Sequence, residues 1–221
     1  MCSSDLEFER AIMIWNGQQV TVYETKGRSV SPTSPSPEPK TTGLPSSAAQ
    51  AKPYFRYQFT PGVGSSGECG PASLAMTLAA LGLEPSGLSV VASINRANSL
   101  IGFRAKAGFT SDREIETGII NAGATPENLV GWNALDRSLS QGKPFIAFGR
   151  ITQDWLNQFS PKINNRDVDH IIAILGKTTN GRYIVADPAY TYGPVEMTQS
   201  QLAVFFRKYG SNPTGRAVAR K

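Results

Sequence analysis

The sequence predicts a domain of the α+β class, in which helices come first and an antiparallel sheet follows. The stretch after Cys69 has helical periodicity, with Leu74, Leu78 and Leu81 at i, i+4 and i+7. Apolar, β-rich runs appear in the second half of the chain. Segregated helices and strands are typical of α+β domains. With 221 residues, 40% of them hydrophobic, the chain can form one packed domain with appendages.

The N-terminal part is expected to lie outside this domain. Residues 1–28 are predicted to form a small β-hairpin, because alternating residues flank Asn16-Gly17, a strong two-residue turn signal. Residues 29–53 are rich in Pro, Ser and Thr, have little to bury, and are predicted to be an extended linker. The main domain is then expected at residues 54–209, followed by a basic tail at 210–221.

Three helices are expected in the first half of the main domain. The first begins at Cys69 and ends near Gly82, a residue suited to a helix C-terminus. The second begins at Ser111, where Glu114 three positions later completes a capping box. A third, short helix is expected over residues 133–139.

Strands dominate the second half. Residues 144–148, 170–175 and 183–186 are apolar and β-rich, which predicts three strands of an antiparallel sheet. Thr198 and Gln201 form another capping box, which predicts a final helix.

Charge and hydropathy exclude some classes of function. The net charge is +5, but much of the excess lies in the last residues without interleaved aromatic side chains, which favours a solvated surface over nucleic-acid binding. No apolar run approaches the roughly 20 residues of a membrane-spanning helix. The first residues, MCSSDLEFER, are acidic where a secretory signal is basic. The protein is therefore expected to be made in the cytoplasm without a signal peptide, and no membrane partner is predicted.

The only two cysteines are Cys2 and Cys69, so neither a structural disulfide nor a multi-cysteine metal site is expected, and no cofactor is predicted. Cys69 lies between Gly67 and Gly70 at the start of the predicted helix. A helix N-terminus offers unpaired N–H groups and a positive dipole, which favour a thiolate. Cys69 is therefore a candidate nucleophile, although a small buried core residue is the structural alternative.

His170 is the only histidine in the chain and opens a predicted strand. A thiolate nucleophile usually works with an imidazole, so His170 is the candidate partner, although a lone histidine at a strand edge is often structural.

Asp187 is the candidate that orients this histidine. If the turn between the last two predicted strands pairs Gly176 with Gly181, His170 lies directly opposite Asp187, and the carboxylate can orient the ring. A tighter turn would instead place Asp187 opposite Ile174. As an alternative, an Asp-Pro pair often only ends a strand.

Four separated segments also resemble a known family. The segments GECGPASLAMTLAALG, QGKPFIAF, DHIIAILG with NGRYIVADPA, and MTQSQLAVFF occur in the order found in papain-like cysteine peptidases of the bacteriocin-processing, double-glycine-leader type. The resemblance spans roughly residues 54 to 207. It implies a papain-like fold, with Cys69 as nucleophile, His170 as general base and acid, and Asp187 as the residue that orients the histidine.

One position departs from the family. Its members carry a glutamine about six residues before the cysteine, where the amide helps to form the oxyanion hole; here Val63 takes that place. The nearest candidate is Gln58, which would require the loop of residues 62–67 to bulge outward. We expect Gln58 and the backbone N–H of Cys69 to be the oxyanion donors.

The resemblance implies hydrolysis of peptide bonds in a protein or peptide substrate. Relatives that trim bacteriocin leaders are commonly fused to a transporter, which this sequence lacks, so leader processing is an alternative. The layout resembles toxins or effectors that a specialised secretion system delivers into a competitor or host cell, which implies an immunity protein that blocks the cleft. A glutamine deamidase, a transpeptidase as in phytochelatin synthases, a cell-wall amidase and a peptide-docking module remain as further alternatives.

Overall fold

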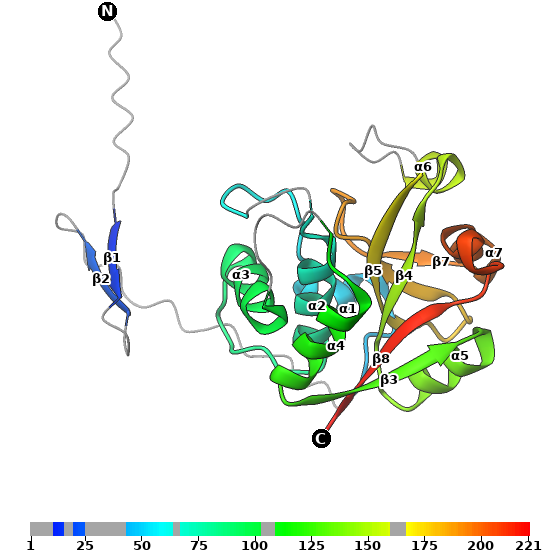
Figure 1. Ribbon diagram of the computed structural model, residues 1–221, viewed down its shortest axis with the longest axis horizontal. Helices are drawn as coiled ribbons and strands as arrows, with labels where there is room; N and C mark the ends of the chain where they lie inside the picture. Colours follow the sequence, from blue (N-terminus) through cyan, green and yellow to red (C-terminus); the bar gives the residue numbers. More distant parts are fainter. Residues whose placement is uncertain (1–10, 16–19, 25–42, 64–66, 103–108, 160–166) are drawn as a thin grey trace, which may run out of the picture. The chain divides into compact units, whose positions relative to one another are not determined.

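The structure is a computed structural model, and it describes residues 11–15, 20–24, 43–63, 67–102, 109–159 and 167–221. The chain divides into two units, Met1–Pro39 and Lys40–Lys221. In the first unit, β1 (Ala11–Trp15) pairs antiparallel with β2 (Val20–Glu24), as Figure 1 shows. Trp15 pairs with Val20, so four residues connect the two strands. The prediction of a two-residue turn is therefore wrong. The expected turn residues themselves lie outside the described residues.

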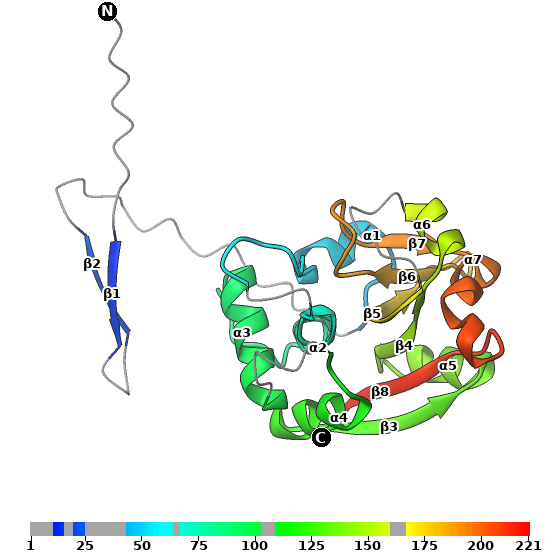
Figure 2. The same ribbon diagram turned by 45° about the horizontal axis from the view of Figure 1, so that its top comes forward.

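The second unit begins with its helices, and those expected at Cys69 and Ser111 are accompanied by two helices and a 3-10 turn that were not expected. They are α1 (Ala48–Ala51), the 3-10 turn η1 (Lys52–Tyr54), α2 (Cys69–Ala80), α3 (Val90–Ile101) and α4 (Asp112–Asn121). Helix α4 begins with the predicted capping box, in which Ser111 and Glu114 exchange hydrogen bonds. Figure 2 views α2 nearly end-on, between α3 and β5.

A six-stranded antiparallel sheet follows, in the order β3-β8-β4-β5-β6-β7. Its strands are β3 (Ala124–Val130), β4 (Phe145–Ile151), β5 (Val168–Lys177), β6 (Tyr183–Ala186), β7 (Val195–Met197) and β8 (Thr214–Arg220). The connections contain α5 (Trp132–Ser140), α6 (Gln153–Phe159), α7 (Gln199–Ala203) and the 3-10 segment η2 (Val204–Tyr209). The α+β class is confirmed. No helix in the described parts of the chain has the length and apolarity needed to cross a bilayer.

The central strands are buried on both faces, which explains their continuous apolar sequence. On β4, Ile146 packs with α2, α3 and α4, whereas Phe145 and Ala147 pack with the aromatic side chains of α6 and η2. The hydroxyl of Ser73 on α2 also donates to the carbonyl of Ile171 on β5, over 3.0 Å. The predicted nucleophile helix is therefore fixed to the strand that carries the histidine.

The predicted basic tail is wrong. Residues 214–220 form β8, an interior strand between β3 and β4, because Ala217 and Val218 are fully buried in the core. One positive charge of this segment is paired: Arg216 contacts Asp112 at 2.9 Å and Glu116 at 3.5 Å on α4. The sequence suggested a solvated tail because arginines alternate with the small and apolar residues of this strand.

The predicted linker also ends earlier than residue 53. Ala51 is fully buried in a cluster with Met76, and the carbonyl of Pro45 lies so close to Gly176 that an added Cβ there would be 2.1 Å away. Residues 43–53 therefore belong to the folded unit. Residues 29–42 lie outside the described part of the chain.

Candidate active site

Cys69 is the first residue of α2, as predicted, and its side chain is buried and not in a disulfide. The neighbouring residues fit a helix start at a crowded position. Pro71 lies in the first turn, where its missing N–H costs no helical hydrogen bond. Gly70 leaves room for Thr110, because a Cβ at residue 70 would lie 2.5 Å from the Thr110 side chain. The thiol is thereby held at the positive end of a 12-residue helix.

Glu68 anchors this helix start from outside. Its carbonyl accepts the hydrogen bond of Ala72 at 2.9 Å, which closes the first helical turn. Its buried carboxylate accepts a hydrogen bond of 2.7 Å from the amide of Asn98 on α3. The backbone before Cys69 is therefore tied to a second helix.

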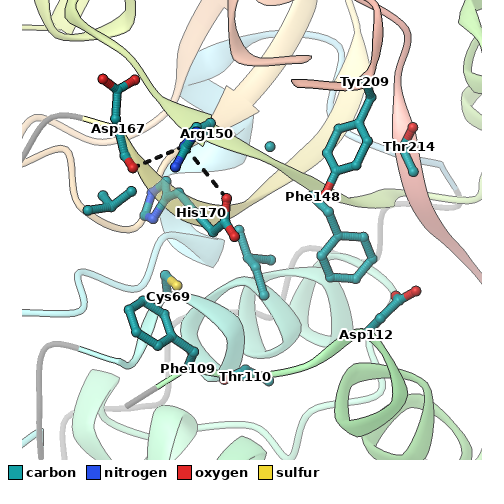
Figure 3. A pocket seen from close by; sticks show the side chains of 14 residues that line it. Cys69, Phe109, Thr110, Asp112, Phe148, Arg150, Asp167, His170, Tyr209 and Thr214 are labelled. Atoms are coloured by element: carbon teal, nitrogen blue, oxygen red, sulfur yellow. Dashed lines mark hydrogen bonds and ion pairs between the residues drawn. The ribbon is translucent and has the colours of Figure 1, made fainter. Parts of the chain in front are cut away.

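His170 on β5 faces the predicted nucleophile. The imidazole Nε2 lies 2.8 Å from Oδ1 of Asp187, and the Cys69 side chain is near enough to the ring to help raise its pKa. Figure 3 shows Cys69 and His170 facing each other at the wall of one cavity. The structure thus brings together the three side chains that the sequence singled out.

The strand register that brings Asp187 to His170 differs from the prediction. The observed ladder pairs Ala173 with Ala186, the last residue of β6. Both registers considered from the sequence are therefore wrong, because this pairing, continued by one residue, places Asp187 level with residue 172. Residues 170 and 172 point to the same side of β5, so the carboxylate reaches the imidazole diagonally.

Asp187 is a buried carboxylate with three hydrogen-bond donors. Oδ1 accepts from Nε2 of His170 and from the backbone N–H of Ala189, both at 2.8 Å, and Oδ2 accepts from the indole Nε1 of Trp155 at 2.9 Å. Sequence reasoning missed Trp155. The available signal was a single tryptophan in the polar stretch TQDWLNQF, between two predicted strands.

The buried histidine and aspartate stabilise each other's charge. Burial is the largest influence on both pKa values, and by itself it lowers that of His170 and raises that of Asp187. The attraction and hydrogen bond between the two groups, with a smaller contribution from Cys69, raise the pKa of His170 to about 10. The same pairing, with the Trp155 and Ala189 hydrogen bonds, holds the pKa of Asp187 below its usual value. At neutral pH the pair is an imidazolium and a carboxylate.

A cavity of about 510 Å³ opens beside Cys69 and His170. Figure 3 shows Phe109 beside Cys69, and Tyr209 with Phe148 on the opposite side. The residues Phe109 and Tyr209 are 67% and 37% exposed, so they offer apolar surface to a bound chain. The remaining lining is mixed in polarity: Thr110, Asp112, Gly149, Arg150, Asp167, Val168, Asp169, Ile171 and Thr214.

Gln58, the predicted oxyanion donor, is buried near the aspartate segment. Its backbone N–H donates to the carbonyl of Pro188 at 2.9 Å, one residue after Asp187. It is not among the described residues that line the cavity, and residues 64–66 of the loop expected to bulge lie outside the described part of the chain. Its oxyanion role stays a prediction. Within the described ranges, no three His, Cys, Asp or Glu residues are grouped to hold a metal ion.

Comparison with known protein families decides the class. The sequence matches the Peptidase_C39 like family over residues 49–212. The chain belongs to this family. The predicted resemblance and the enzyme class are confirmed: the protein is a cysteine-type peptidase, which acts on protein or peptide substrates. No curated protein matches the chain.

Three solved structures are similar to this member of the Peptidase_C39 like family. The peptidase domain of Streptococcus ComA, a bi-functional ABC transporter involved in a quorum sensing pathway, is 19% identical, with 71% of this chain and 94% of that chain covered and a TM-score of 0.46. A putative C39-like peptidase from Bacillus anthracis is 16% identical, with coverages of 76% and 94% and a TM-score of 0.49. The peptidase domain of Streptococcus mutans ComA is 17% identical, with coverages of 75% and 96% and a TM-score of 0.43.

Proposed function

We propose that the protein cleaves peptide bonds by a Cys69–His170–Asp187 mechanism. The observation that carries this proposal is the 2.8 Å contact between His170 Nε2 and Asp187, at a cavity that the Cys69 side chain also lines. Because Nε2 is engaged by the carboxylate, Nδ1 is the nitrogen left to exchange a proton with Cys69 and the substrate. Asp187 thereby fixes both the orientation of the ring and which nitrogen is available.

The proposed reaction has two acyl-transfer steps. The Cys69 thiolate attacks the peptide carbonyl, and the resulting oxyanion accepts hydrogen bonds from the Cys69 backbone N–H and, in our proposal, from the Gln58 amide. The His170 imidazolium protonates the leaving amine as the C–N bond breaks, which leaves a thioester and a neutral imidazole. That imidazole then takes a proton from water, the water attacks the thioester, and the acid product and thiolate are released.

Substitution of the nucleophile and the base tests this proposal. Cys69→Ala and His170→Ala should each abolish cleavage while the domain stays folded, and the double variant should be scarcely worse than either single variant because the residues act together. Intact masses of candidate substrates separate the reaction classes. Hydrolysis shortens the chain, deamidation only replaces an amide by an acid, transpeptidation joins two peptides, and a docking module changes nothing.

We further propose that the peptidase is a toxin or effector, delivered by a specialised secretion system and active in the cytoplasm of a competitor or host cell. The support is the layout: a hairpin unit and a peptidase unit separated by a Pro/Ser/Thr-rich segment. Expression in a bacterial cytoplasm should arrest growth with the wild type but not with Cys69→Ala. Normal growth with both, combined with cleavage of a double-glycine leader peptide in vitro, would favour leader processing instead.

The proposed immunity protein is expected to cover the cavity beside Cys69. Its binding should therefore block alkylation of Cys69 by iodoacetamide as well as peptide cleavage. A partner that restores growth while Cys69 stays reactive would act at another step, and the proposed mode of inhibition would be wrong.

A further inference from the structure

We propose that Trp155 is a positioning residue for the peptidase reaction: its indole N–H holds the Asp187 carboxylate in the orientation that engages His170. The proposal rests on the catalytic roles proposed above for Cys69, His170 and Asp187. Trp155 lies 32 residues before Asp187 in the sequence, on the short helix α6, and is fully buried.

The hydrogen bonds of the carboxylate show why this contact matters. His170 and the Ala189 backbone both donate to Oδ1, whereas Oδ2 accepts the 2.9 Å bond from Trp155. The Trp155 indole is the donor that the structure shows at Oδ2. Asp187 is only 3% exposed, so water has little access to replace a lost donor. Without the indole N–H, the carboxylate keeps the two donors shown at Oδ1 but loses the one shown at Oδ2, so its plane is less firmly fixed.

The indole is itself held rigidly. Its ring packs against Phe205, with centroids 4.9 Å apart, and Phe205 also meets the His170 ring edge-on at 6.2 Å. Gly149, which faces His170 across the β4–β5 ladder, makes room for Phe205, because a Cβ there would lie 2.3 Å from the phenyl ring. One phenylalanine thus supports both the histidine and the tryptophan that converge on Asp187.

The indole hydrogen bond also favours the ionised carboxylate, and it is one of the contacts that lower the pKa of Asp187. Its removal should therefore have two effects. The imidazole should lose orientation at every pH, and Asp187 should take up a proton at a higher pH than in the wild type. A residue that only filled the core would produce neither the second effect nor a dependence on Asp187.

Trp155→Phe in the full chain tests the proposal, since it keeps an aromatic ring and removes the N–H. Cys2→Ser in all proteins leaves Cys69 as the only thiol, and its alkylation by iodoacetamide is followed by intact mass against pH. Trp132→Phe is the matched control, because Trp132 donates its indole N–H to the Ser211 carbonyl at 3.2 Å and packs on Phe206 in the same core. Circular dichroism checks that both variants are folded.

We expect Trp155→Phe to slow alkylation about tenfold at neutral pH, less than the roughly hundredfold that a 1 Å misplacement of a reacting group can cost. The acid limb of the rate profile should move upward by about one pH unit, as expected when a carboxylate loses one of three donors. Trp132→Phe should leave both the rate and the limb unchanged. A wild-type profile for Trp155→Phe, or an equal loss in both variants, would overturn the proposal.

A double variant separates this proposal from the triad itself. If Trp155 acts through Asp187, Trp155→Phe should add nothing in an Asp187→Asn background. If the two substitutions reduce the alkylation rate independently, so that their effects multiply in the double variant, Trp155 only fills the core. If Asp187→Asn alone alkylates at the wild-type rate, the proposed triad fails first; if it is slow while Trp155→Phe is normal, only the role of Trp155 is wrong.

Discussion

Replacement of Asp187 by asparagine should remove most of the charge on His170 at neutral pH. In the wild type the pKa of His170 is raised from 6.5 to about 10, and Asp187 provides the largest favourable contributions. Each pKa unit corresponds to about 1.4 kcal/mol, so the environment favours the imidazolium by about 5 kcal/mol. Burial then acts almost unopposed in Asp187→Asn, and the buried ring should be neutral at pH 7. It can no longer donate a proton to the leaving amine.

The expected loss in peptide turnover is large, about 10⁴-fold by analogy with the loss of the aspartate in a serine peptidase triad. Turnover and iodoacetamide alkylation should both be followed against pH, with circular dichroism as the test of folding. Asp136→Asn is the matched control, because Asp136 accepts hydrogen bonds from Lys177 at 2.7 Å and Tyr183 at 2.8 Å away from the cavity. Wild-type turnover by folded Asp187→Asn would refute the reasoning.

Three further outcomes follow from the packing and charge. The buried imidazolium–carboxylate pair should contribute its histidine-linked stability fully below pH 6.5 and lose it as pH rises towards about 10, so the denaturation midpoints of wild type and Asp187→Asn should converge in that window. Midpoints that stay equally far apart across it would contradict the raised pKa. Gly149→Ala should lower the free energy of unfolding by about 1–3 kcal/mol through overpacking against Phe205. Gly43→Ala is the control and should change this free energy little, because nothing lies within 4 Å of the added Cβ. Equal denaturation midpoints in the two variants would argue against the close contact between Gly149 and Phe205. A chain that begins at residue 40 should keep the thermal stability of the full protein. One that begins at residue 54 should be less stable, because it lacks the buried α1 segment. Equal melting temperatures of the two shortened chains would mean that this segment does not contribute to the folded unit.

The helices that the sequence predicted are those whose ends are marked locally. The capping boxes at Ser111 and Thr198 are both present, and α2 begins at Cys69 as expected. Helix α3 was missed because its sequence, VVASINRANSLI, is rich in Ser, Asn and β-branched residues of low helix propensity. The helix packs against α2 and α4, and these tertiary contacts determine which of its side chains are buried.

The sheet was harder to predict because strand partners are far apart in sequence. Strand β8 carries the alternating pattern TGRAVAR, but its arginines suggested a solvated end; only the acidic residues of α4 reveal that Arg216 is paired. The register between β5 and β6 depends on an irregularity between Ile174 and Gly176, which the intervening turn does not reveal.

The predicted site shows the same division between local and tertiary information. Cys69 and His170 could be proposed because the chain offers one cysteine at a helix start and one histidine. Trp155 could not, since its contact with Asp187 exists only after α6 packs beside Phe205. A tryptophan in a polar stretch can pack against many different core residues, and the sequence alone does not indicate which of them it contacts.

The most direct test of the central claim is a comparison of protein N-termini in cells that express the wild type or Cys69→Ala. Terminal-peptide proteomics detects new N-termini in any cleaved protein, so the substrate need not be identified beforehand. A cysteine peptidase with Cys69 as nucleophile predicts a set of new N-termini in the wild-type sample that is absent with Cys69→Ala, although both proteins are expressed and folded. The same new N-termini in both samples, or none in either, would contradict this account.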